Sequence, residues 1–133
     1  MGGCITTLQS VKGTSLFPEL YEWNDAILFL ETPETKPEPM YFRYWIRDLG
    51  CMGVLEKING IIVGKPYDEC YYTEYKHILL QVLNQEFQLY DLPVLYNLNF
   101  GHTAPMIILP YGALAEIDCI EKKFSIVSQA VKA

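Results

Sequence analysis

The chain has 133 residues, half of them hydrophobic, which is enough for one domain with a single buried core. Its net charge is −6 and its ten Lys and Arg residues are scattered, so it lacks the basic patch that a nucleic-acid-binding surface requires. No apolar run approaches the ~20 residues that span a bilayer, and the first residues lack the features of an export signal. We therefore expect a cytoplasmic protein that binds small molecules or proteins, but neither nucleic acid nor membrane.

The four cysteines lie far apart in the sequence, with no C-x-x-C pair and no histidines at zinc-finger spacing. We therefore expect no metal site and no disulfide framework. As a separate expectation, the protein needs no cofactor. Isolated thiols more often fill a core than react, so we interpret them as small buried side chains in a reducing compartment. These cysteines are Cys4, Cys51, Cys70 and Cys119.

The first residues, GGCITTLQSVKGT, are typical of a helix that ends at Lys12 and is capped by Gly13. Residues 1–25 are then a lead-in helix and loop. A protein rarely begins on a Gly-Gly helix entry, so we expect the chain to be cut from a longer one, with Met1 not the natural start.

Strands and helices alternate in the next part of the chain. Three short apolar runs predict strands that are covered on both faces, and the two segments between them have helical start signals or helical periodicity. This alternation predicts parallel strands joined by right-handed crossovers. The expected strands are Ala26–Leu30, Asn59–Val63 and Pro93–Leu98, and the expected helices are Met40–Leu49 and Tyr75–Phe87.

The pattern of apolar and polar residues changes after Gly101. Short apolar stretches are broken by the turn at residues 110–112 and by the charged residues 121–123, which predicts two or three small strands forming a hairpin. The expected fold is thus α/β: a small parallel sheet flanked by helices, with a C-terminal β-hairpin appendage.

Two ionisable residues follow strands of the predicted sheet. Glu31 comes directly after its strand, and His102 is the fourth residue after the last strand. The carboxyl ends of parallel strands meet at one edge of the sheet, so we expect these side chains to lie together. A carboxylate that holds a histidine is the usual preparation of a general base.

A nucleophile for this pair is missing from the sequence. No G-x-S-x-G elbow is present, and the four serines lie in ordinary helix, turn or strand contexts. From these residues alone, a solvated Glu31 and a structural Gly-His turn remain alternatives to a catalytic pair.

Several stretches together resemble the C-terminal domain of the LD-carboxypeptidase family, which includes muramoyl-tetrapeptide carboxypeptidases and microcin C immunity proteins. The resemblance covers essentially the whole chain. It is carried by ILFLET at 27–32, LGCMGVLEKINGIIVGKP at 49–66 and LPVLYNLNFGHTAPMIILPYGALAEID at 92–118.

The resemblance implies a two-domain serine peptidase. Its C-terminal domain, to which this chain corresponds, would be of the swivelling β/α type. Glu31 and His102 would be the carboxylate and base of a Ser-Glu-His triad, and the serine would lie in an N-terminal domain outside this chain. The fragment alone would be inactive. Many family members carry an acidic residue where this chain has Thr32. The implied substrate is a peptidoglycan-type peptide or a microcin-like peptide-nucleotide, and the sequence does not choose between them.

Two rival hypotheses stay open: a non-catalytic module that binds peptides or a partner, and a purely structural domain. Lys65 is expected near the same sheet edge. The aromatic run from Tyr41 to Trp45 falls on more than one helix face, so part of it should be exposed, which makes a homodimer a further expectation.

Overall fold

A computed structural model describes residues 1–130 of the chain. Its centre is a parallel sheet in the order β1-β2-β3-β4, formed by Gly2–Cys4, Ile27–Glu31, Gly60–Gly64 and Val94–Leu98. The three strands predicted from apolar runs are confirmed, each beginning one residue later than expected. The prediction of a parallel α/β sheet is therefore correct.

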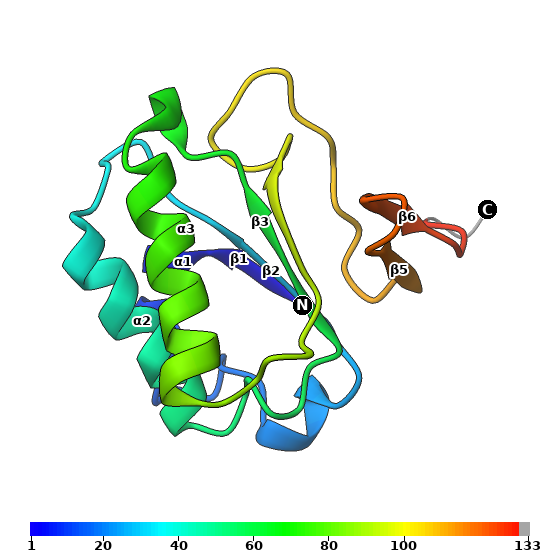
Figure 1. Cartoon of the computed structure of the whole chain (residues 1–133). Coiled ribbons are helices and arrows are strands. Elements are labelled where there is room, and N and C mark those ends of the chain that lie inside the picture. The colour runs from blue at the N-terminus through cyan, green and yellow to red at the C-terminus, as the bar shows by residue number, and fades with distance from the viewer. Residues whose placement is uncertain (131–133) are drawn as a thin grey trace.

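Helices cover one face of this sheet (Figure 1). Helices α1, α2 and α3 span Ile5–Val11, Pro39–Cys51 and Tyr72–Gln81, and the last continues as a π-helical turn, η3, over Val82–Glu86. Short 3-10 turns, η1 and η2, occupy Leu20–Trp23 and Tyr67–Glu69. Both predicted helices are present: α2 extends beyond its predicted bounds at both ends, whereas α3 with η3 begins three residues earlier and ends one residue earlier than predicted. Helix α1 ends at Val11 with Lys12 as its C-cap, one residue before the predicted end.

The main core lies between the sheet and these helices. Leu28 and Leu30 of β2 are fully buried there, together with Ile46 of α2 and Leu79 of α3. Side chains alternate along a strand, so the residues between them point to the opposite face. Each helix thus presents one apolar stripe to one face of the sheet.

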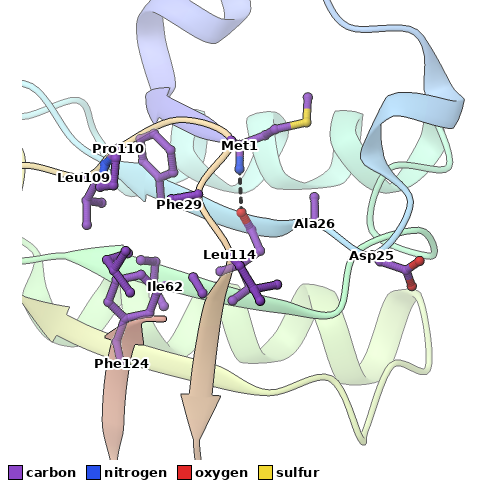
Figure 2. A pocket seen from close by; sticks show the side chains of 14 residues that line it. Met1, Asp25, Ala26, Phe29, Ile62, Leu109, Pro110, Leu114 and Phe124 are labelled. Carbon is purple, nitrogen blue, oxygen red and sulfur yellow. Dashed lines mark hydrogen bonds between the residues drawn. The ribbon is translucent and has the colours of Figure 1, made fainter. Parts of the chain in front are cut away.

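The opposite face is covered by the C-terminal part of the chain. Strands β5, Ala115–Asp118, and β6, Lys123–Ile126, pair antiparallel and confirm the predicted hairpin. The hairpin lies on the side of the sheet away from α2 and α3 (Figure 1). Phe29 and Ile62 of the sheet and Phe124 of β6 line a cavity of about 260 Å³ here, beside Met1, whose amino group donates to the Ile27 carbonyl at 2.7 Å (Figure 2). The hairpin therefore does not fill the space between itself and this face of the sheet.

Two expectations about the strands were wrong. The Gly-Gly entry is not part of a helix but forms β1, because Gly2 adopts a φ of 148° and lies so close to β2 that a Cβ would be 1.8 Å from the Phe29 carbonyl oxygen. Strand β4 is also not covered on both faces, since four of its five residues are only half-buried and Asn97 is exposed.

The cysteines do not fill the core. Cys51 and Cys119 are exposed, and Cys4 and Cys70 are partly buried; all four are free thiols. Each lies at the end of an element or in a turn, where side chains leave the packed interior. Among residues 1–130, no helix is both long and apolar enough to cross a bilayer.

Candidate active site

Glu31 and His102 meet at the carboxyl edge of the sheet, as their places after two strands predicted. Glu31 is the last residue of β2, and its side chain is only 9% exposed, whereas that of His102 is 38% exposed. His102 Nδ1 lies 2.6 Å from Glu31 Oε2, and the His102 backbone N–H donates to the same oxygen at 3.3 Å. Two contacts from one residue therefore fix the carboxylate against the loop.

Glycine at position 101 makes this close approach feasible. Gly101 has a φ of 84°, in the left-handed region that other residues rarely adopt, and a Cβ there would lie 2.5 Å from the Cβ of Glu31. The turn after β4 thus requires glycine for both its backbone and its space.

The second ring nitrogen of His102 faces a different group. Nε2 lies 3.2 Å from Glu34 Oε2, and the Glu34 side chain is largely exposed. With the Nδ1 proton donated to Glu31, the neutral imidazole has its lone pair on Nε2. The ring is thus held at Nδ1 by a nearly buried carboxylate, and at Nε2 it faces an exposed carboxylate that has to move before Nε2 can take part in proton transfer.

The surrounding charges favour the protonated ring. The hydrogen bond to Glu31 is the main cause that raises the pKa of His102, with smaller contributions from the charges of Glu31 and Glu34, while burial acts in the opposite direction. A raised pKa makes the neutral ring a stronger base, and it also increases the fraction of rings that already carry the proton near neutral pH.

A pocket of about 620 Å³ opens beside His102. Lys65 lines it, as expected, together with Glu34, Tyr67 and Met106. None of the described serines lines this pocket: Ser10 donates to the Thr6 carbonyl within α1, and Ser128 accepts from the Leu114 amide. Ser15 precedes the η1 turn and Ser125 belongs to β6.

Sequence reasoning missed two residues of this site. Glu34 lies only three positions after Glu31, and this short spacing indicates that both carboxylates can reach the same histidine ring. Cys4 pairs in register with Glu31 across β1 and β2, and one ligand atom each of Cys4, Glu31 and His102 lie within 4.8 Å of one another. No local spacing signals that cluster, because it depends on the pairing of β1.

Comparison with known proteins decides the family. Residues 1–117 match the family model of the LD-carboxypeptidase C-terminal domain. The chain belongs to the LD-carboxypeptidase family. The domain is 30% identical over 132 residues to the microcin C7 self-immunity protein MccF of Escherichia coli, covering 97% of this chain and 36% of that protein.

Solved structures agree with this LD-carboxypeptidase assignment. A crystal structure of an MccF-like protein from Streptococcus pneumoniae in complex with AMP has a TM-score of 0.82 and 35% identity, over 96% of this chain and 40% of that one. MccF in complex with glutamyl sulfamoyl guanosine has a TM-score of 0.83 and 29% identity, over 99% of this chain and 38% of that one. The domain thus spans well under half the length of these relatives.

Proposed function

We propose that this LD-carboxypeptidase domain supplies Glu31 and His102 to a Ser-Glu-His triad whose serine lies in an N-terminal domain outside these 133 residues. The observation that carries the proposal is the 2.6 Å contact between His102 Nδ1 and Glu31 Oε2, with Nε2 beside Glu34, which lines the pocket. The whole protein is then a two-domain serine peptidase, and this part alone is inactive. A cytoplasmic location stays a prediction.

In this mechanism, His102 Nε2 takes the proton of the serine hydroxyl as the oxygen attacks the substrate carbonyl. Glu31 holds the ring by Nδ1 and stabilises the imidazolium that forms. The proton then passes from Nε2 to the leaving amine, and water repeats the cycle on the acyl-enzyme. Glu34 must give up its contact with Nε2 when the serine approaches, and its exposed side chain is free to turn into solvent.

The substrate in this proposal is an amide of a small peptide, either of peptidoglycan type or joined to a nucleotide-like group. The second class is supported by relatives whose structures hold AMP or glutamyl sulfamoyl guanosine. Lys65 lines the pocket beside His102 at 3.9 Å from the exposed carboxylate of Glu69, and by turning from this long contact it can attract a carboxylate or phosphate of the substrate.

We place the serine domain against the exposed segment Met106–Leu114. Its side chains at Met106, Ile108 and Leu114 are 69%, 92% and 67% exposed, although all three are apolar. Met106 also lines the pocket beside His102, so a domain that covers this segment would reach the base. A homodimer through the same segment is the competing arrangement.

The test is a chimera in which this domain replaces the C-terminal domain of E. coli MccF. Hydrolysis of an aminoacyl sulfamoyl nucleoside and of a peptide ending in a D-amino acid would be followed by mass spectrometry. We expect cleavage of at least one substrate, and a fall in kcat/KM of roughly 10³-fold or more in His102→Ala and Glu31→Gln, because the base or its orienting group is lost.

Matched controls are His77→Ala and Glu56→Gln, which change exposed residues outside the site. They should retain the parent rate. Full activity in His102→Ala would contradict the triad, and a chimera that binds substrate without cleaving it would favour the non-catalytic binding module.

A further inference from the structure

The thiol of Cys4 lies beside Glu31 and His102, yet the proposed mechanism gives it no role. Parallel pairing of β1 and β2 sets Cys4 opposite Glu31, and the loop after β4 adds His102. One ligand atom from each of the three side chains lies within 4.8 Å of the other two. The Cys4 Sγ also contacts Thr6 Oγ1 at 3.1 Å, which restrains the direction of the thiol.

Sulfur, imidazole nitrogen and carboxylate oxygen are the donors that zinc prefers. Zinc–ligand bonds of the usual lengths place neighbouring donors roughly 3.3–3.7 Å apart in a tetrahedral site. The cluster is already within 4.8 Å, so small side-chain rotations would suffice. The 2.6 Å contact between Nδ1 and Oε2 would widen by about 1 Å to admit the ion. Three protein donors leave the fourth position to water.

Two further features of the site suit a cation. A metal-bound histidine usually donates its other N–H to a carboxylate, which fixes the ring, and Glu34 lies at 3.2 Å from Nε2 for this purpose. Cys4 and Glu31 line a cavity of about 200 Å³, and His102 lines the pocket of about 620 Å³ that shares Gly101 with it, so the three donors border two spaces that an ion can enter. The carboxylates of Glu31 and Glu34, one on each side of the His102 ring, add negative charge to the site.

We propose that Cys4, Glu31 and His102 form a zinc-binding site, and that zinc bound there inhibits the enzyme. The inhibition rests on the proposed function; the binding does not. On binding, the Cys4 thiol releases its proton to solvent, and the imidazole proton moves from Nδ1 to Nε2, where Glu34 accepts the hydrogen bond. Nothing is oxidised or reduced. Nε2 then has no lone pair for the serine proton, and Glu31 no longer holds Nδ1.

Metal binding is tested on the 133-residue chain itself with Co²⁺ as a spectroscopic probe and Zn²⁺ in competition. We expect one equivalent of cobalt with a thiolate-to-cobalt absorption band. Glu34→Gln removes a hydrogen-bond partner of a metal ligand and should weaken zinc binding by roughly 10-fold. Cys4→Ser removes a ligand itself, so it should abolish the band and weaken zinc binding by more than ~10-fold. Cys51→Ser, which changes an exposed thiol, should behave as the parent.

A second route guards against a folding defect in the Cys4 variant. His102→Ala keeps the thiol and changes a partly exposed loop residue, and it should also weaken zinc binding more than ~10-fold, whereas His77→Ala should not. Absence of the thiolate band in the parent, or equal loss of the band in Cys51→Ser, would overturn the site.

Inhibition is tested on the chimera by dividing the rate with zinc by the rate with chelator. In the parent and in Cys51→Ser, we expect this ratio to be well below one. Adding chelator to the zinc-inhibited enzyme should restore the full rate. A chimera that hydrolyses equally with and without zinc would overturn the inhibition. A chimera that never hydrolyses, while the cobalt band is present, would refute the proposed function and leave the metal site standing.

Discussion

Gly101 controls how closely His102 can approach Glu31. Its positive φ lets the chain turn sharply after β4, and the missing Cβ makes room for the glutamate side chain. The glycine can be read from the sequence, but the need for it cannot. The atoms that a Cβ at position 101 would meet belong to Glu31, which is far away in the chain.

Replacing Gly101 with Ala should destabilise the protein by more than the strain alone. The left-handed backbone costs about 1–2 kcal/mol for a residue with a Cβ, and the contact with Glu31 adds to this. Gly13→Ala is a matched control, since Gly13 has a φ of 75° and no atom within 4 Å of a Cβ. Urea unfolding gives the free energy of unfolding of both variants, and the difference between their losses measures the contact of the new Cβ with Glu31. Equal losses of stability would show that the space beside Glu31 is not needed.

The pKa of His102 should report its bond to Glu31. Because the folded pKa is raised above the ordinary 6.5, the protonated ring stabilises the fold fully at pH below 6.5, and this contribution disappears as pH rises through the folded value. We expect an NMR titration to place His102 above 6.5. Glu31→Gln should lower this pKa more than Glu34→Gln, since the hydrogen bond to Glu31 is the larger cause. An unchanged His102 pKa in Glu31→Gln would contradict the pairing.

Among the elements, α2 illustrates what periodicity predicts well. Its apolar residues Phe42, Ile46 and Leu49 recur every three or four positions and are buried, while Tyr41 and Tyr44 are about half exposed, as the aromatic run indicated. Strand β1 illustrates the opposite case. Two glycines in three residues have no strand propensity, so only pairing with β2 makes that segment a strand.

Ile46→Ala should cost about 2–5 kcal/mol, because it leaves a cavity between α2 and the sheet. Tyr44→Ala, on the exposed side of the same helix, should change stability by no more than about 0.5 kcal/mol. Denaturant unfolding measures both, and similar losses would mean that the helix packs by the wrong face.

At the scale of the whole molecule, the two faces of the sheet are covered unequally. The helices pack tightly on one face, whereas the hairpin encloses a cavity on the other and Met106–Leu114 leaves apolar side chains exposed. The chain also spans only 36–40% of the relatives cited above. Both observations support the proposal that a further domain completes the binding site.

The sequence by itself determined the parallel α/β sheet, the helix faces, the hairpin and the presence of Glu31 and His102 at one sheet edge. These follow from local apolar patterns and from the rule that parallel strands end together. Only the tertiary structure decided that Nδ1 and Oε2 meet across 71 residues and that Cys4 joins them. The reason is physical: such distances depend on strand register, on the turn at Gly101 and on the pairing of β1, and each of these is fixed by contacts between segments far apart in the chain.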